Sequence, residues 1–374
     1  RIDLPLYGSN GMAVTEQAVQ EALQRVVDPL TGVDVVTSKA LRNLHVDGAN
    51  VAFDVELGYP ARSLWAALQA NLVAAAKSVP GVGEVTAQVS SKVVAHATQR
   101  GLNPMPGVRN IIAVASGKGG VGKSTTAVNL ALALVAEGAT VGLLDADIYG
   151  PSQPMMTGTS GKPETLDGKT MEPKRNHGLQ VYSIGFLVAE DQAMVWRGPM
   201  ASQALEQLIT QTNWQDLDYL IVDMPPGTGD VQLTLSQKVP LTGAVIVTTP
   251  QDIALIDARK GIRMFEKVGV PILGIVENMA VHVCSQCGHA EHIFGDAGGQ
   301  KMAADMGMDY LGGLPLSMAI RQQADSGIPT MVAAPESEAA QLYAGIARKV
   351  AVKVAQKAKD FSSKFPTISI SKNT

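Results

Sequence analysis

Hydrophobic and polar positions at the start of the chain predict a small α/β unit. Apolar residues recur at helical spacing from Val14, and the pattern stops at Asp28-Pro29 because proline disfavours helix in the residue before it. Two alternating stretches flank Asp47-Gly48, a favoured hairpin turn. The pattern thus predicts two helices and three strands, at Val14–Val26 and Arg62–Lys77 and at Leu41–Val46, Val51–Leu57 and Glu84–Val89.

From Asn110 the pattern changes to short apolar runs separated by helical stretches. This alternation predicts an α/β fold with a doubly wound, mostly parallel sheet, in which ligands bind beyond the carboxyl ends of the strands. The predicted strands are Ile111–Ala115, Val141–Leu144, Tyr219–Val222, Ala244–Thr248 and Ile272–Val276, and the clearest helices are Thr125–Glu137, Ala201–Gln211 and Ile256–Val268. The expected parts are an extraneous or disordered N-terminus over 1–11, a small domain over 12–90, a linker over 91–109, a larger domain over 110–360 and a flexible tail over 361–374.

Composition narrows the class of protein. Hydrophobic residues make up 46% of the 374 residues and charged residues 17%, which suits a largely parallel sheet with a sizeable core. The formal net charge is −4 and no half of the chain is strongly basic, so we expect no nucleic-acid partner. No apolar run reaches the roughly 18–20 residues of a membrane span. We therefore expect a cytoplasmic protein without a membrane span.

A glycine-rich loop between a predicted strand and a predicted helix carries the strongest chemical signal. It satisfies G-x-x-x-x-G-K-[ST], the P-loop that surrounds nucleotide phosphates with backbone N–H groups at a helix N-terminus. We expect Lys123 to reach the β- and γ-phosphates and Ser124 to bind Mg²⁺, which predicts ATP as a ligand. The expected nucleotide-binding residues of the loop are Gly117, Lys118, Gly119, Gly120, Val121, Gly122, Lys123, Ser124 and Thr125.

Three aspartates follow predicted strands and should lie at the same edge of the sheet. Asp223 ends Tyr219–Val222, as a Walker B acid does, and precedes a Pro- and Gly-rich loop at 225–229 that could respond to the γ-phosphate. Asp145 and Asp147 follow Val141–Leu144. One of them could orient the attacking water while another holds hydrated Mg²⁺. Either could instead be a helix cap or a turn residue.

The chain contains two cysteines, Cys284 and Cys287, spaced as C-x-x-C. A secreted disulfide framework needs more pairs, so metal or redox chemistry is favoured. A [4Fe–4S] cluster or a tetrahedral metal site has four ligands, and a two-fold dimer would supply two cysteines from each subunit. The alternative within one chain is a zinc site that adds His289 and His292, although their spacing is shorter than in zinc fingers. A redox dithiol is less favoured, because such motifs usually open a helix.

The second lysine of the loop, Lys118, gives the pattern K-G-G-V-G-K-[ST]. This resembles the deviant Walker A ATPases, which include MinD, ParA and the nitrogenase iron protein. The resemblance implies that Lys118 reaches the partner's phosphates across a nucleotide-sandwich homodimer. Residues 12–90, with Asp28-Pro29 and Val79–Val82, resemble a MIP18-like domain. Many members of that family carry a cysteine near the start of the second helix. This chain has none there, which excludes a thiol-based role for the domain.

Further motifs resemble the bacterial Mrp (ApbC) branch of the Mrp/NBP35 iron–sulfur cluster carrier ATPases over about 108–335. They are Asp145–Ser152, Trp196–Met200, Asp223–Asp230, Thr249–Asp252 and Val276–Met279 before the C-x-x-C. The resemblance implies slow ATP hydrolysis, a cluster on Cys284 and Cys287, and transfer to apo iron–sulfur proteins alongside cluster assembly proteins. It also implies that Asp147 positions water, that Asn278 binds the adenine, and that Asp145 is an outer-shell Mg²⁺ residue.

Two alternatives remain at this point. The first is a positioning ATPase of the MinD or ParA type, for which the C-terminal stripe from Leu342 to Val354 would be an interfacial helix, although a helix packed on the sheet is the simpler interpretation. The second is a nucleotide switch with a structural zinc site. The C-x-x-C separates these from a cluster carrier, because positioning needs no such motif.

Overall fold

The computed structural model describes residues 13–96, 98, 102–187 and 198–357. The chain divides into two compact units, Arg1–Lys92 and Val93–Thr374, which are described separately. The expected N-terminal segment 1–11 and tail 361–374 lie outside the described residues, and so do Trp196 and Arg197 of the motif Trp196–Met200.

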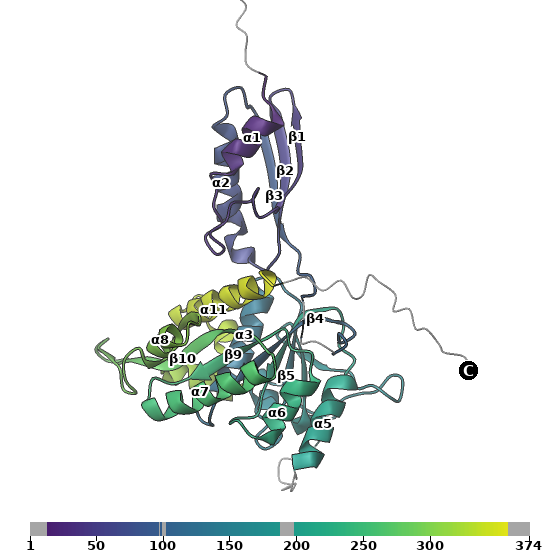
Figure 1. The fold of residues 1–374 in the computed structure, drawn as a ribbon, viewed down its shortest axis with the longest axis vertical. Helices are drawn as coiled ribbons and strands as arrows, with labels where there is room; N and C mark the ends of the chain where they lie inside the picture. The colour runs from purple at the N-terminus through teal and green to yellow at the C-terminus, as the bar shows by residue number, and fades with distance from the viewer. Residues whose placement is uncertain (1–12, 97, 99–101, 188–197, 358–374) are drawn as a thin grey trace, which may run out of the picture. The chain divides into compact units, whose positions relative to one another are not determined.

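The first unit is a three-stranded sheet with two helices (Figure 1). Its elements are α1 (Glu16–Leu23), β1 (Leu41–Asp47), β2 (Asn50–Leu57), a 3-10 turn at Arg62–Leu64, α2 (Trp65–Lys77) and β3 (Val85–Ser91). β1 and β2 form the predicted antiparallel hairpin, and β2 pairs in parallel with β3. Val51, Phe53 and Val55 are buried at every second position of β2, so one face of the strand forms the core.

The second unit is built on a nine-stranded sheet with the order β11-β10-β9-β4-β8-β5-β7-β6, in which β12 pairs with β10. All pairings are parallel except those of β6 and β11. The strands are β4 (Val108–Ala115), β5 (Val141–Asp145), β6 (Lys174–Asn176), β7 (Leu179–Ser183), β8 (Leu217–Asp223), β9 (Gly243–Thr248), β10 (Ile272–Val283), β11 (Ala290–Glu291) and β12 (Tyr310–Pro315). The predicted doubly wound, mostly parallel sheet is confirmed.

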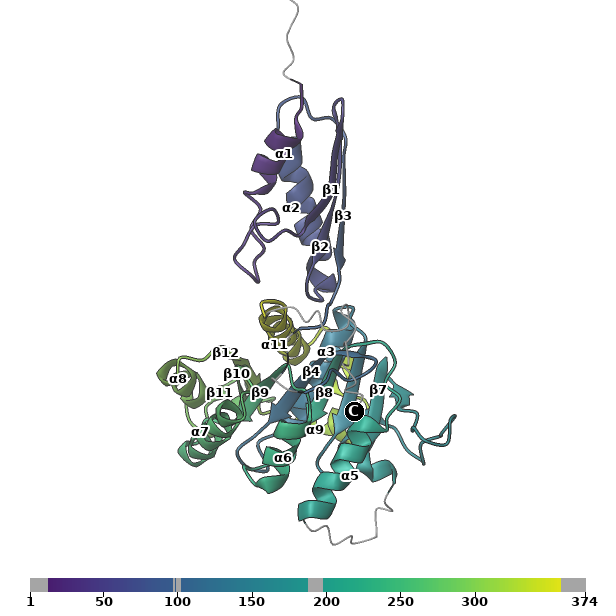
Figure 2. The ribbon, with the colours of Figure 1, turned by 45° about the vertical axis from the view of Figure 1, so that its right-hand side comes forward.

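Helices cover both faces of this sheet. α3 and α11 lie on one face, and α5, α6 and α7 lie on the other (Figures 1 and 2). The helices are α3 (Lys123–Ala136), α4 (Gln153–Thr157), α5 (Gly198–Thr210), α6 (Asp230–Lys238), α7 (Asp252–Lys267), α8 (Gly298–Asp305), α9 (Met318–Asp325), α10 (Thr330–Ala333) and α11 (Glu338–Ala355), with a 3-10 turn at Ile184–Phe186. The central strands are buried on both faces, which explains their continuous apolar runs.

The C-terminal helix α11 packs on α3 and beside β12. Three of its stripe residues, Ile346, Val350 and Val354, are at most 2% exposed, whereas Leu342 at its start is 37% exposed. Arg348 forms a 2.6 Å ion pair with Glu137. The simpler interpretation, a helix packed on the domain, is therefore confirmed. Across the described ranges, no helix is both long and apolar enough to cross a membrane.

Candidate functional site

The P-loop lies between the end of β4 at Ala115 and the start of α3 at Lys123, as predicted. Two of its glycines could not carry a side chain. A Cβ on Gly117 would lie 2.2 Å from the carbonyl carbon of Asp257 in α7, and one on Gly122 would lie 2.0 Å from Asn278 Nδ2. Gly122 also has φ 78°, in the left-handed region. The predicted residues from Gly117 to Gly122 therefore form a closely packed turn ahead of the helix, and Lys123, Ser124 and Thr125 are its first residues.

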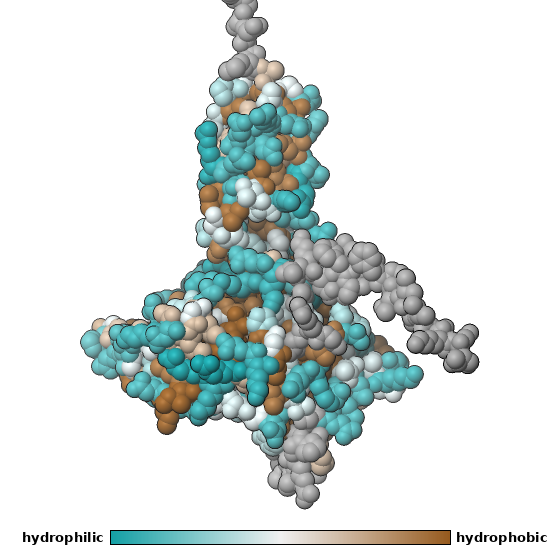
Figure 3. Space-filling view, in the orientation of Figure 1, coloured by the Kyte–Doolittle hydropathy of each residue, from teal (hydrophilic) through white to brown (hydrophobic). Residues whose placement is uncertain are grey.

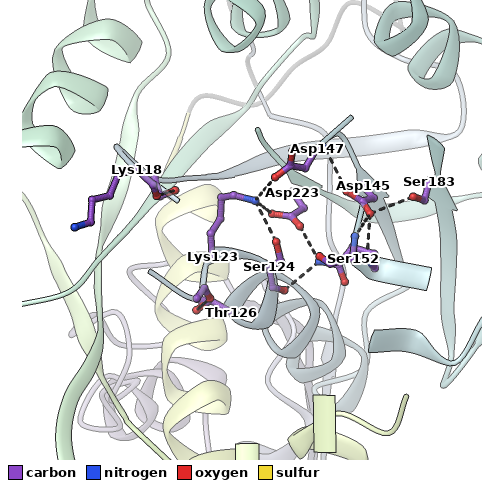
Figure 4. Close-up of polar contacts among 12 residues, drawn as sticks. Lys118, Lys123, Ser124, Thr126, Asp145, Asp147, Ser152, Ser183 and Asp223 are labelled. Carbon is purple, nitrogen blue, oxygen red and sulfur yellow. Dashed lines mark hydrogen bonds and ion pairs between the residues drawn. The ribbon is translucent and has the colours of Figure 1, made fainter. Parts of the chain in front are cut away.

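Lys123 lies in a cluster of carboxylates and is 6% exposed. Its Nζ donates to Asp223 Oδ1, lies 3.2 Å from Ser124 Oγ and 4.0 Å from Asp147 Oδ2. Figure 4 shows these side chains pointing toward one another, whereas Lys118 extends away from them. The structure thus brings Lys123, Ser124, Asp147 and Asp223 together, and directs Lys118 elsewhere.

Asp145 is fully buried at the end of β5. Its Oδ2 accepts hydrogen bonds from the backbone N–H groups of Ser152 and Gln153, each at 3.0 Å, and from Ser183 Oγ at 3.1 Å, while Oδ1 accepts from the backbone N–H of Asp147 at 3.2 Å. Burial, and then the charge of the neighbouring Asp223, raise the pKa of Asp145 to about 7. Three of these donors lie at 147–153, so the carboxyl organises the loop after β5, and the outer-shell magnesium role predicted for Asp145 stays a prediction.

Asp147, two residues further on, is better placed for chemistry. Its side chain is 13% exposed, and burial raises its pKa although Lys123 opposes the shift. A raised pKa moves a carboxyl toward the range in which it can exchange a proton at neutral pH. The position agrees with the water-orienting role that was predicted for Asp147, which stays a prediction.

Gln153, the first residue of α4, was not among the predicted site residues. Its side chain is fully buried, and its Nε2 donates to Asp223 Oδ2 at 2.8 Å and to the carbonyl oxygen of Ser124 at 3.0 Å. Gln153 therefore contacts both the P-loop helix and the Walker B strand. A single glutamine carries no periodic or motif signal of its own, so the residue could be found only from the fold.

Asn278 lies in β10 and packs against the P-loop. Its Nδ2 donates to the carbonyl oxygen of Val121 at 2.9 Å, and the side chain is buried against Gly122. Met279 follows with φ 57°, and the pairing of β10 with β12 shifts register between Glu277 and Val281. A non-glycine residue in the left-handed region is an uncommon backbone conformation that often marks a functional site. The predicted contact of Asn278 with adenine stays a prediction.

The C-x-x-C forms the turn of the β10–β11 hairpin. Cys284 follows directly after β10, where its N–H donates to the carbonyl oxygen of His289 at 2.9 Å, and the Gly288 N–H donates to the Cys284 carbonyl oxygen at 2.8 Å. Both cysteines are free; Cys287 is exposed and Cys284 is partly exposed. Backbone N–H groups of Gln286 and Cys287 donate to the Cys284 thiol and lower its pKa. A lowered pKa favours the thiolate, the form that ligates metals.

The zinc site within one chain does not assemble. His282 Nδ1 lies 3.0 Å from the carbonyl oxygen of Leu316, and His292 Nδ1 lies 2.8 Å from that of Ala280, so these rings are held against the backbone. The other predicted histidine ligand, His289, has Nε2 3.6 Å from Glu291 Oε1. Over the part of the chain that the structure describes, no group of three or more His, Cys, Asp or Glu residues is placed to hold a metal ion. Within the described ranges, Cys284 and Cys287 are thus left without a third side chain placed to share a metal ion with them.

Both units of the chain match models of known protein families. Residues 107–351 match the family model of the NUBPL iron-transfer P-loop NTPases, within the ParA group, and residues 16–89 match that of an iron–sulfur cluster assembly protein. The second match covers the unit predicted to be MIP18-like.

Individual relatives agree with the family models. An iron–sulfur cluster carrier protein of Escherichia coli strain K12 is 62% identical over 257 residues, 68% of this chain and 69% of the relative. One from Haemophilus influenzae is 47% identical over 352 residues, covering 93% of this chain and 94% of the relative. The iron–sulfur cluster transfer protein NUBPL of Mus musculus is 55% identical over 249 residues, 66% of this chain and 78% of the relative.

Solved structures agree on the fold. A nucleotide-binding protein from Archaeoglobus fulgidus in complex with ADP superposes with a TM-score of 0.53 at 36% identity, covering 59% of this chain and 87% of that chain. The cell division ATPase MinD of Pyrococcus furiosus superposes with a TM-score of 0.50 at 23% identity, over 64% of this chain and 98% of that chain, a similarity of fold alone.

Proposed function

The chain belongs to the NUBPL iron-transfer P-loop NTPases, and from this membership and the geometry of its two sites we propose that it is an ATP-hydrolysing carrier of iron–sulfur clusters. It binds the cluster as cargo on Cys284 and Cys287 and transfers it to apo-proteins. The positioning-ATPase alternative gives the cysteine hairpin no role, and the zinc-switch alternative lacks its ligand set in the described residues.

The observation that carries the proposal is the path of β10. This single strand contacts the P-loop through the bond from Asn278 to Val121, and it ends at Val283, directly before Cys284. A change in the P-loop on nucleotide binding can therefore be passed along one covalent element to the cysteine hairpin. Met279, which has a left-handed backbone conformation, lies between Asn278 and the cysteine hairpin and is the position at which we expect the strand to flex.

The acidic cluster supports ATP hydrolysis. Ser124 Oγ and the carboxylate of Asp223 are hard oxygen donors, which suit Mg²⁺, and Asp145 can act from the outer shell. When bound there, Mg²⁺ supplies a charge that offsets the phosphates. Lys123 contributes a buried positive charge to the β- and γ-phosphates, the P-loop N–H groups contribute dipoles, and Asp147 orients the attacking water.

A homodimer completes the cargo site. One chain supplies two thiolates, whereas a [4Fe–4S] cluster takes four. Large apolar side chains are exposed on segments that follow the carboxyl ends of the strands: Tyr149, Met155, Ile253, Ile256 and Met318, at 55–65% exposure. Figure 3 shows hydrophobic surface over α7. A second copy would cover these residues and bring Lys118 to the opposite nucleotide, as in the deviant Walker A ATPases.

The exposure of Cys287 suits a cargo that must leave. A cluster held in a surface hairpin is open to attack by the thiolates of an apo-protein, whereas a buried site would protect it. The partners are therefore apo iron–sulfur proteins and the assembly proteins that load the carrier. Two free cysteines in one chain fit a reducing compartment, which we take to be the cytoplasm.

A transfer assay tests the proposal. The chain is reconstituted anaerobically with iron and sulfide, mixed with an apo-enzyme that regains activity when it receives a cluster, and followed with and without Mg²⁺-ATP. Cys284→Ala should abolish reactivation while ATP binding stays within about two-fold of the unmodified chain, because the cysteine hairpin is separate from the P-loop. Full reactivation by the Cys284→Ala protein would refute the carrier function at this site.

A further inference from the structure

We propose that Gln153 is a positioning residue of the nucleotide site, which fixes the carboxylate of Asp223 against the first turn of α3 so that the site can accept a magnesium nucleotide. The inference rests on the proposed ATP-binding function and deepens it. Neither the P-loop pattern nor the acidic residues of the sequence analysis pointed to this glutamine.

Gln153 joins the three segments that form the site. Its Nε2 donates to Asp223 Oδ2 at the end of β8 and to the carbonyl oxygen of Ser124 in α3. Its backbone N–H donates to Oδ2 of Asp145 at the end of β5, at 3.0 Å. With Lys123 on the other oxygen, Oδ1, both oxygens of Asp223 are held, and the carboxylate has one orientation.

The hydrogen-bond network fixes which way the amide points. Asp223 Oδ2 and the Ser124 carbonyl are both acceptors, so the nitrogen of the Gln153 amide has to face them. The amide oxygen, Oε1, then points elsewhere, and it is buried without a hydrogen-bond partner among the described residues. An unpaired buried acceptor is costly and calls for an explanation such as a water or an ion.

Gln153→Met tests this role, because methionine has nearly the same length and no hydrogen-bonding amide. Gln180→Met is the matched control. Gln180 is also buried, at 7% exposure, but among the described residues its amide bonds only the backbone of Gln215, at 2.8 and 3.0 Å. For each protein, the Kd of a non-hydrolysable ATP analogue is measured by calorimetry with Mg²⁺ and again with EDTA. The Kd in EDTA divided by the Kd with Mg²⁺ gives a ratio that isolates the contribution of the metal.

We expect Gln153→Met to reduce this ratio about 10- to 100-fold, the effect of losing one hydrogen bond to a buried charged group, while the Kd in EDTA changes little. Gln180→Met should lower stability and leave the ratio unchanged. Gln153→Glu, which presents an oxygen to two acceptors, should lower the ratio at least as far, and it serves as the test if the methionine variant does not fold.

Other outcomes would overturn the inference in distinguishable ways. A ratio in Gln153→Met equal to that of the unmodified chain would show that Gln153 has no positioning role, and would leave the ATP site standing. An equal loss of affinity with Mg²⁺ and with EDTA would reduce Gln153 to a structural residue. An unmodified chain that binds no nucleotide would refute the proposed function itself, and this inference with it.

Discussion

Lys123→Met removes the positive member of a buried ion pair and keeps the length of the side chain. Lys123 and Asp223 have 6% and 0% of their side chains exposed, so the substitution leaves a buried carboxylate without its cation. Removing one partner of a buried pair costs about 3–5 kcal/mol. For a domain of this size, about 1 kcal/mol lowers Tm by about 2–4 °C. We therefore expect Tm to fall by about 6–20 °C in the absence of nucleotide.

The assay is thermal unfolding followed by circular dichroism, with two further variants as controls. Lys118→Met removes a lysine of the same loop that extends away from the carboxylates, so its Tm should stay close to that of the unmodified chain (Figure 4). Lys123→Met combined with Asp223→Asn removes both charges and should recover most of the loss, since no unpaired charge stays buried. A Lys123→Met protein as stable as the unmodified chain would refute the buried pair.

Three further predictions address other parts of the site. Gly122→Ala should weaken ATP binding at least about ten-fold in calorimetry, because a Cβ would meet Asn278 and the position has φ 78°; unchanged affinity would contradict this packing. Asn278→Leu should reduce the effect of ATP on the rate of cluster transfer while the cluster still binds. An undiminished effect of ATP would exclude β10 as the connection between the P-loop and the cysteine hairpin. The pKa of Asp145 is raised to about 7, so its protonated form stabilises the fold at low pH and this contribution is lost as pH rises from about 4 through 7. Between pH 5 and pH 8 the Tm of the unmodified chain should therefore fall more than the Tm of Asp145→Asn. An equal fall in Tm for the two proteins would refute the raised pKa of Asp145.

The sequence predicts the P-loop well because its glycines and Lys123 follow a buried strand, and each residue type answers a local requirement of phosphate binding. The same holds for Asp145, Asp147 and Asp223, since parallel strands bring their carboxyl ends to one edge of the sheet. Strands β4, β5, β8 and β9 were found because both faces are buried and their apolar runs are unbroken.

Other features depend on tertiary contacts that leave no pattern in the chain. β12 contains Gly312 and Gly313 and was missed, because strand propensity is low there and pairing with β10 stabilises it. β10 runs to Val283, well beyond the predicted end at Val276. The prediction stopped short because the second half of the strand is partly exposed and carries polar residues, so its apolar run is broken. Gln153 was missed for a similar reason: its function comes from neighbours that lie 29 and 70 residues away in sequence.

The measurement that tests the central claim most directly is the metal and sulfide content of the anaerobically reconstituted chain, determined together with its mass in solution. We expect a dimer with about four irons and four labile sulfides, and we expect both to be lost in Cys287→Ala. Zinc without labile sulfide, or iron that survives Cys287→Ala, would contradict a cluster carried on the cysteine pair.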